Sequence, residues 1–313
     1  MAALAGAIIC APAARGEPMR HAQAHMRHAQ ALAAPAHDTS RIVSIGGAIT
    51  EILYALGLAP RIVAVDSTSF HPPLALREKP NVGYFRRLSP EGVLGLNPSL
   101  ILAIEGAGPI EAISVLKAAG VDFVSVPDHF TDAGIVEKIR IVAGVTGEMR
   151  RGECLANAVA ADLDALAQLR KQIERPARAL FLLSFAGERA QVAGRATAAD
   201  GIMQLAGATN AITEFEGYKP VSNEAIIAAR PDAVLAMQRN ADTLDARTVF
   251  AHQAFALTPA ARRQAFVAMN GLYLLGFGPR TARAARDLAS KLYPTLPQPE
   301  FPSEAASTER CLE

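Results

Sequence analysis

The sequence predicts an α/β protein made of two Rossmann-like lobes joined by one long helix. Short apolar runs typical of buried strands alternate with helical patterns along most of the chain. One phrase occurs twice, and a single long helical pattern over residues 148–173 separates the two copies. Such alternation is typical of mainly parallel sheets covered by helices. We therefore expect a ligand cleft between the lobes, where the carboxyl ends of their strands face each other.

The repeated phrase consists of a serine, a glutamate, a proline and an apolar run at the same spacing, in residues 89–103 and again in 222–236. In each copy the serine can cap a short helix, and the glutamate falls in its first turn, where the helix dipole favours an anion. Each lobe should therefore present one matching acidic side chain, Glu91 or Glu224. From the residues alone, a pair of merely solvated glutamates is an equal alternative.

The expected elements follow in order. In the first lobe, we expect strands at 42–45, 61–65, 100–104 and 123–126 and helices at 50–56, 89–94, 109–119 and 132–145. In the second lobe, we expect strands at 179–183 and 233–237 and helices at 197–206, 222–229 and 280–292. The chain then divides into an N-terminal segment at 1–37, lobes at 38–147 and 176–294, a linking helix at 148–175 and a tail at 295–313.

Composition and motifs exclude several classes of function. A formal charge of +1, the absence of Trp and the lack of a Lys/Arg cluster among aromatics argue against nucleic-acid binding. Cys10, Cys154 and Cys311 are too scattered for a CxxC metal or redox unit, and we expect lone structural thiols. No HExxH, Gly-x-Ser-x-Gly or Walker-type loop supports an enzyme, so we expect no catalysis.

The N-terminus resembles the end of a secretory signal. Residues 1–14 are small and apolar, and Ala-Pro-Ala at 11–13 resembles a cleavage site, although no basic residue precedes the apolar run. A start codon placed too late would explain this, and cleavage near Ala33 is an equal alternative. Residues 19–32 form a tandem repeat with three histidines, which we expect to be disordered or removed rather than a metal site. No later stretch is apolar over enough residues to span a bilayer.

Three loops that follow predicted strands should line the cleft: residues 66–72, 128–130 and 184–189. The first contains His71 and the second His129. Taken alone, a loop histidine is more often an exposed or capping residue than a ligand.

Six phrases of the chain resemble the periplasmic haem-binding proteins of bacterial haem-uptake ABC transporters, within the larger group of cobalamin- and siderophore-binding proteins. The resemblance covers Arg41 to about Pro294. The phrases that carry it are residues 48–57, 65–72, 82–94, 192–200, 217–220 and 275–280.

This resemblance implies a monomeric periplasmic carrier that takes haem b as its transported ligand in the cleft. It delivers the haem to an inner-membrane ABC permease dimer with its ATPase, for iron acquisition. Glu91 and Glu224 match the family's pair of acidic residues, one from each lobe, that dock on arginines of the permease. No stable insertion into the membrane is implied, and whether one haem or two stacked haems bind stays open.

The chain departs from the family's pattern at the iron ligand. Many relatives read Asp-Thr-Thr-Ser-x-Tyr-Pro, with the tyrosine as an anionic axial ligand, whereas His71 stands at this position here. Histidine is itself a common haem ligand, and it would make binding sensitive to protonation at about pH 6. His129, Tyr84 and Tyr218 remain alternative ligands.

The two propionates of a haem need cationic or hydroxyl partners at the mouth of the cleft. Arg86 matches the family's arginine most directly, and Arg87 is a second candidate. Ser67, Thr68 and Lys219 are secondary candidates, for which a turn or capping role is the better interpretation. The rings of Phe70 and Phe185 are expected to flank the macrocycle. The competing hypotheses are a carrier for a ferric siderophore or a corrinoid, which needs no axial side chain, and a metallohydrolase using His71 and His129.

Overall fold

The computed structural model describes residues 37–186, 189–238 and 244–312. The predicted secretory signal, the histidine repeat at 19–32 and Cys10 lie outside the described residues. Within the described part, no helix combines the length and the apolar character that crossing a bilayer requires.

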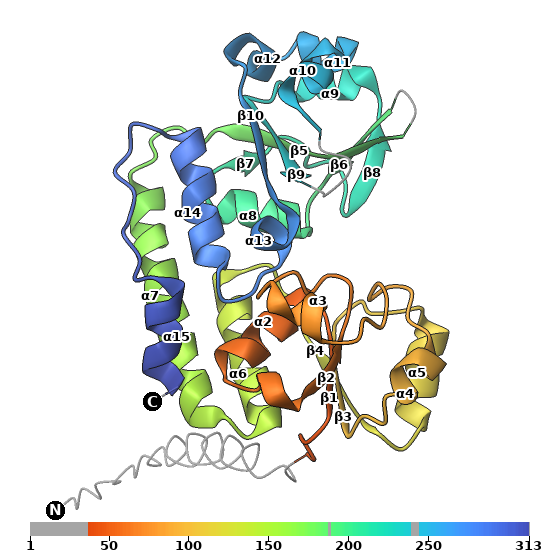
Figure 1. Cartoon of the computed structure of the whole chain (residues 1–313). Helices are drawn as coiled ribbons and strands as arrows, with labels where there is room; N and C mark the ends of the chain where they lie inside the picture. The colour runs from red at the N-terminus through yellow and green to blue at the C-terminus, as the bar shows by residue number, and fades with distance from the viewer. Residues whose placement is uncertain (1–36, 187–188, 239–243, 313) are drawn as a thin grey trace, which may run out of the picture. The chain divides into compact units, whose positions relative to one another are not determined.

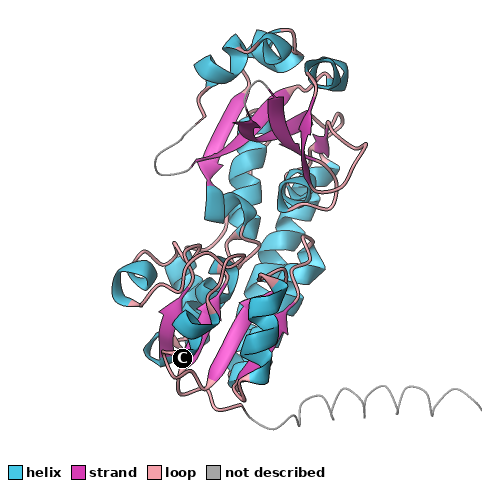
Figure 2. Cartoon of the chain, turned by 90° about the vertical axis from the view of Figure 1, so that its right-hand side faces the viewer, coloured by secondary structure: helices cyan, strands magenta, loops and turns pink. Residues whose placement is uncertain are grey.

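The first lobe contains a four-stranded, fully parallel sheet in the order β2-β1-β3-β4 (Figures 1 and 2). All four expected strands are present, and the central β1 and β3 are buried along their whole length, as parallel strands covered on both faces should be. The strands are β1 (Ile42–Ile45), β2 (Ile62–Val65), β3 (Leu100–Ile104) and β4 (Asp122–Val126). The helices are α2 (Gly47–Ala55), η1 (Ala59–Arg61), α3 (Leu74–Glu78), α4 (Pro90–Leu94), α5 (Ile110–Ala118) and α6 (Asp132–Thr146).

The expected linking helix is α7, which runs from Met149 to Lys171. It begins directly after α6, which ends at a left-handed Gly147, a residue that carries no Cβ to oppose this conformation. One face of α7 buries a row of apolar side chains, and α6, α14 and α15 pack against the helix (Figure 1).

The second lobe contains a mixed sheet, whereas mainly parallel strands were expected. Its order is β10-β9-β5-β6-β8, with β7 beside β5; β5, β7, β9 and β10 are parallel, but β6 runs antiparallel to both β5 and β8. The connection between Ala186 and Arg189 is too short for a crossover, so the chain can only return as a hairpin. The strands are β5 (Arg178–Ala186), β6 (Arg189–Ala193), β7 (Thr209–Asn210), β8 (Tyr218–Val221), β9 (Ala233–Gln238) and β10 (Phe266–Asn270).

The helices of the second lobe include the three expected ones, α8, α9 and α14, together with several short ones that the sequence patterns did not predict. They are α8 (Ala198–Leu205), α9 (Asn223–Ala229), α10 (Ala246–Ala251), α11 (Gln253–Ala256), α12 (Pro259–Arg263), α13 (Gly271–Leu275) and α14 (Thr281–Leu292). The C-terminal α15 (Glu304–Leu312) packs on α7 instead.

One hydrophobic core extends through both lobes. It contains Ile49 of α2, Val142 of α6, Leu163 of α7, Phe181 of β5 and Leu288 of α14, each essentially inaccessible to solvent. Two smaller clusters cover the remaining faces of the two sheets. The shared core makes the lobes one packed unit around α6, α7 and α14.

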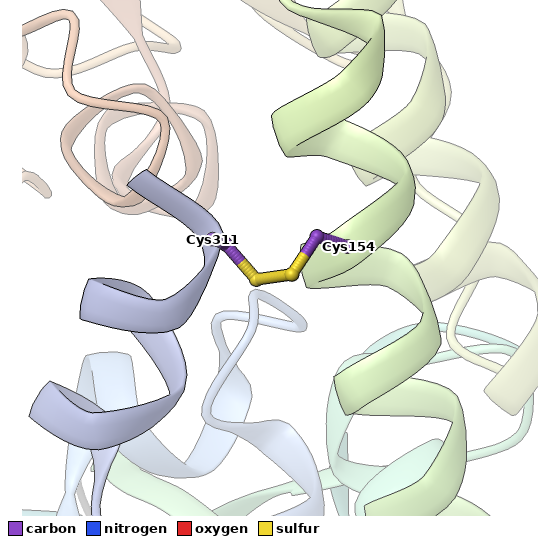
Figure 3. Close-up of a disulfide and its surroundings, with 2 residues drawn as sticks. All are labelled: Cys154 and Cys311. Atoms are coloured by element: carbon purple, nitrogen blue, oxygen red, sulfur yellow. A yellow bond between two sulfur atoms is a disulfide. The ribbon is translucent and has the colours of Figure 1, made fainter. Parts of the chain in front are cut away.

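The expectation of lone cysteines is wrong for two of the three. Cys154 on α7 and Cys311 on α15 form a disulfide, which ties the C-terminal helix to the linking helix (Figure 3). The two residues are 157 positions apart in sequence. Spacing rules that search for nearby cysteines cannot detect such a pair, because only the packing of α15 on α7 brings them together.

Candidate functional site

The loop after β2 is organised around one buried carboxylate, that of Asp66. Its oxygens accept hydrogen bonds from the backbone N–H of Gly46 at 3.0 Å and of Thr68 at 3.1 Å. The hydroxyls of Thr68 and Ser69 also donate to it, at 2.8 Å and 3.0 Å. Burial raises the pKa of Asp66, and these hydrogen bonds oppose the rise. This network fixes the start of the loop that carries Phe70 and His71.

A chain of hydroxyl groups attaches the same loop to the sheet and to α2. Ser69 and Thr50 share a hydrogen bond of 2.7 Å between their side-chain oxygens, and Thr50 shares another of 2.7 Å with Ser44 of β1. The hydroxyl of Thr68 also accepts a hydrogen bond from the backbone N–H of Gly47 at 2.9 Å. The hydroxyl and the backbone N–H of Thr68 are therefore both engaged in hydrogen bonds inside the loop.

The loop at 83–87, which carries the predicted propionate contacts, lies directly beside the loop after β2. The backbone N–H of Ser67 donates to the carbonyl of Gly83 at 2.9 Å, which joins the two loops. The guanidinium of Arg86 lies 5.1 Å from the ring centre of Phe85, which in turn meets the Tyr84 ring edge-on at 4.8 Å. Tyr84, Arg86 and the neighbouring Arg87 are exposed.

Arg86 is also close enough to Tyr218 of the second lobe for its charge to act on that phenol. Burial raises the pKa of Tyr218, while hydrogen bonds with Ala199 and Thr197 and the positive charge of Arg86 oppose the rise. The structure thus brings together a candidate propionate contact from one lobe and a candidate ligand from the other. Because its pKa is raised, Tyr218 is less ready than an exposed tyrosine to act as a phenolate.

His71 lies at the end of the same loop, before a cis peptide bond to Pro72. It borders a cavity of about 500 Å³ whose walls come from α2, α7, α15 and the start of α14, among them Glu51, Val159 and Arg280. The neighbouring Phe70 is half exposed, at 49% of its surface. The loop therefore presents an exposed aromatic ring next to the predicted iron ligand.

The other candidate histidine sits in a different environment. His129 follows β4, is exposed, and its Nδ1 lies 3.5 Å from a carboxylate oxygen of Glu137 on α6. His129 therefore has an exposed imidazole beside an acidic side chain of the same lobe.

Two candidate contacts of the second lobe have partners of their own. Phe185 stacks on His252 at 5.1 Å between ring centres and meets Phe255 edge-on at 6.1 Å, against the second hydrophobic cluster. The ammonium of Lys219 lies 5.3 Å from the ring centre of Phe215.

The two repeated glutamates have nearly identical surroundings. Ser89 caps α4 and Ser222 caps α9, each accepting a backbone hydrogen bond at 3.3 Å. The pKa of Glu91 and that of Glu224 are both lowered, first by a hydrogen bond from the glutamate's own backbone N–H and second by one from the capping serine. The predicted capped acidic turn is thus confirmed in both lobes.

Two ion pairs that the sequence patterns did not reveal lie where the lobes meet: Glu51–Arg280 joins the lobes directly, and Lys138–Asp128 lies inside the first lobe, with Lys138 also bonded to the second lobe. The carboxylate of Glu51 accepts hydrogen bonds from the Arg280 guanidinium at 3.0 Å and from its backbone N–H at 3.1 Å. The fully buried ammonium of Lys138 donates to Asp128 at 2.5 Å and to the carbonyl of Phe277 at 3.1 Å. A charged residue on an otherwise apolar helix face, such as Glu51 in α2, is the signal that could have indicated them.

Comparison with known proteins identifies the family. The model of the periplasmic binding protein family matches residues 42–277. The chain belongs to this family. The match begins at β1 and ends within the segment between α13 and α14, so it includes both sheets and the linking helix.

Solved structures of similar proteins share the whole fold. The periplasmic heme-binding protein RhuT from Roseiflexus sp. RS-1, in apo form, is 40% identical with a TM-score of 0.77, over 82% of this chain and 98% of RhuT. The periplasmic heme-binding protein BhuT, in complex with two hemes, is 38% identical with a TM-score of 0.76, over 80% of this chain and 97% of BhuT. A curated relative, the ABC transporter substrate-binding lipoprotein YvrC of Bacillus subtilis (strain 168), is 24% identical over 82% of this chain and 81% of its own length.

Proposed function

We propose that this protein is a periplasmic carrier that captures haem b between its lobes and delivers it to an inner-membrane ABC permease for iron uptake. The observation that carries the proposal is the similarity to RhuT and BhuT, which extends over nearly their full lengths at 40% and 38% identity. Two proteins described as heme-binding thus share this chain's lobes, its linking helix and about two fifths of its residues.

The iron is coordinated by His71 in this proposal. A neutral imidazole is a common axial ligand of haem, and His71 stands in the loop that Asp66 and its hydroxyl partners hold in place. A ligand on a fixed loop loses little conformational freedom when it binds the metal. Tyr218 is the weaker alternative, because burial raises its pKa and so disfavours the phenolate form.

The propionates are held by Arg86 and Arg87. Both arginines are exposed, on a loop that the Ser67–Gly83 hydrogen bond attaches to the ligand loop. A guanidinium can donate two parallel hydrogen bonds to a carboxylate, and this geometry suits a propionate at the edge of a cleft. Ser67 lies at the junction of the two loops, and Phe70 provides an apolar surface for the porphyrin.

The protein performs no chemistry on the haem. Capture needs a formed site and reversible coordination, and delivery needs recognition by the permease. Glu91 and Glu224 supply that recognition in this proposal, because each is a fully exposed carboxylate at the first turn of a capped helix, one on each lobe.

An absorbance titration of the purified protein with hemin tests the proposal. The wild type should saturate and develop a sharp Soret band, and His71→Ala should shift that band and weaken binding by about tenfold or more. His129→Ala is the matched control, since it removes a histidine from another loop that follows a strand, and its titration should follow the wild type. An unchanged His71→Ala spectrum would indicate that Tyr84, Tyr218 or His129 coordinates the iron instead. If the wild type does not bind hemin, the haem assignment fails and a corrinoid or ferric siderophore becomes the leading ligand.

A further inference from the structure

The second lobe has a pocket of about 380 Å³ at the edge of its sheet opposite the carboxyl ends of the parallel strands. It lies at the amino ends of β5 and β9 and at the C-terminal ends of α9 and α12. Its charged lining residues are five arginines and one carboxylate: Arg175, Arg178, Arg230, Arg262, Arg263 and Asp232. The pocket is separate from every residue proposed to hold haem.

Two of the five arginines and the single carboxylate are already engaged. Arg178 donates to the carbonyls of Ala229 and Ala211, at 3.1 Å and 3.4 Å. Asp232 accepts from the backbone N–H of Arg178 at 3.1 Å and from the guanidinium of Arg263 at 3.0 Å. The one negative charge of the pocket is therefore paired with the guanidinium of Arg263 and also accepts a hydrogen bond from the backbone of Arg178.

The other three arginines, Arg175, Arg230 and Arg262, form no ion pair with any residue that the structure describes, and all three are exposed. The contact found for Arg262 is a long one of 3.5 Å to the carbonyl of Leu257. Three guanidinium groups thus border the pocket without a counter-charge. Their mutual repulsion, screened by solvent, would be relieved by an anion.

Arg230 occupies a position where the backbone favours glycine. It ends α9 with φ of 46° and ψ of 54°, in the left-handed region, where a side chain costs conformational energy that glycine avoids. The strained backbone holds a guanidinium at the wall of the pocket.

We propose that this pocket binds an anion carrying phosphate groups, of the size of a diphosphate or a phosphodiester head group. Guanidinium groups remain charged at all physiological pH values and match the oxygens of a phosphate in a bidentate arrangement. The pocket volume exceeds that of one phosphate, and three unpaired arginines suit a ligand with two or more charges. The ligand is either a soluble phosphate compound or the head group of an anionic phospholipid.

Calorimetric titration of the full-length protein with sodium pyrophosphate tests the site. The expected result is saturable binding of one pyrophosphate per chain, weakened at least about tenfold in the double variant Arg230→Gln/Arg262→Gln. The matched control is Arg77→Gln/Arg150→Gln, which removes two exposed arginines outside the pocket and should leave the affinity unchanged. Absence of saturable binding, or equal weakening in both double variants, would overturn the proposal.

Sedimentation with vesicles separates the two sources. If the ligand is a lipid head group, phosphatidylglycerol vesicles retain the wild type but not Arg230→Gln/Arg262→Gln, and pyrophosphate releases it. If the ligand is soluble, pyrophosphate binds and the vesicles do not retain the protein. Hemin titration of Arg230→Gln/Arg262→Gln should match the wild type. The haem proposal and the phosphate proposal are therefore tested independently of each other.

Discussion

The two lobes carry the same acidic turn on different sheets. In the first lobe, α4 with Glu91 leads to a parallel strand in a fully parallel sheet. In the second, α9 with Glu224 leads to the parallel β9, but the same sheet continues into the antiparallel strands β6 and β8. The lobes are thus alike where the repeated phrase lies and differ where it is absent.

This difference shows that a capped turn and the direction of a strand depend on different parts of the sequence. A capped turn depends on residues within one helical turn, so a matching phrase reproduces it wherever it occurs. The direction of a strand depends on the length of the connection before it, so the short hairpin after β5 changes the sheet without altering the phrase. Equivalent acidic turns therefore do not require equivalent lobes.

The strongest test of the comparison addresses Lys138, which pairs with Asp128 inside the first lobe and donates a hydrogen bond to the carbonyl of Phe277 in the second lobe. Lys138→Met should reduce the free energy of unfolding by about 3–5 kcal/mol, because it leaves the Asp128 carboxylate without its buried partner. Chemical denaturation measures the effect. Lys117→Met, which removes a lysine near the Phe123 ring on the surface of the first lobe, should cost less than about 1 kcal/mol. A loss below about 1 kcal/mol for Lys138→Met would indicate that neither the pair with Asp128 nor the hydrogen bond to Phe277 stabilises the packed unit.

The second connection is the disulfide, which joins α15 to α7 without involving either sheet. Cys311→Ser should destabilise the oxidised protein by about 2–4 kcal/mol, because the bond constrains the unfolded chain. Denaturation with and without a reductant measures the effect, and the reductant should abolish the difference between variant and wild type. Finding Cys154 and Cys311 as free thiols in the purified, unreduced protein would contradict the pairing.

The third prediction concerns the loop that distinguishes the first lobe. Asp66→Asn should reduce the free energy of unfolding by about 1–3 kcal/mol. The NH2 group of the asparagine side chain is a donor only, so it cannot accept the hydrogen bonds that one of the carboxylate oxygens accepts. It should also weaken hemin binding, since the loop carries His71. Asp164→Asn on the exposed face of α7 is the control, and equal effects of the two changes would show that the Asp66 network does not order the loop.

The smallest expected effect tests the equivalence of the acidic turns directly. The pKa values of Glu91 and Glu224 lie below their usual range, so the stabilisation by these carboxylates is present above the usual pKa and is lost only as the pH falls through the lowered one. Ser89→Ala and Ser222→Ala should each raise the pKa of the neighbouring glutamate and cost about 1 kcal/mol. Titration followed by NMR measures the pKa values of both glutamates. A pKa shift in only one lobe would show that the two acidic turns are not equivalent.

Local patterns predicted much of the fold. The buried strands of the first lobe, α7 and the caps at Ser89 and Ser222 follow from apolar periodicity and capping chemistry over a few residues. Strands β6 and β8, which pair antiparallel to each other, were missed, because polar residues or a proline interrupt their short sequences and leave no continuous apolar run. The disulfide and the buried Lys138 depend on contacts between distant segments, which no local pattern contains.

The candidate site shows the same division. The sequence identified the loop with His71 and the loop with Arg86, and the structure adds that the Ser67–Gly83 hydrogen bond joins them. The sequence did not identify Asp66 as the centre of the hydrogen-bond network in the first loop. The burial of a carboxylate depends on the packing of the whole lobe.

The most direct test of the central claim is a crystal structure of the protein crystallised with hemin. The account predicts one axial bond from the His71 imidazole to the iron and propionates in contact with Arg86. Iron bound by Tyr84, Tyr218 or His129 with His71 elsewhere would contradict the assignment of the ligand, and a haem found outside the space between the lobes would contradict the account as a whole.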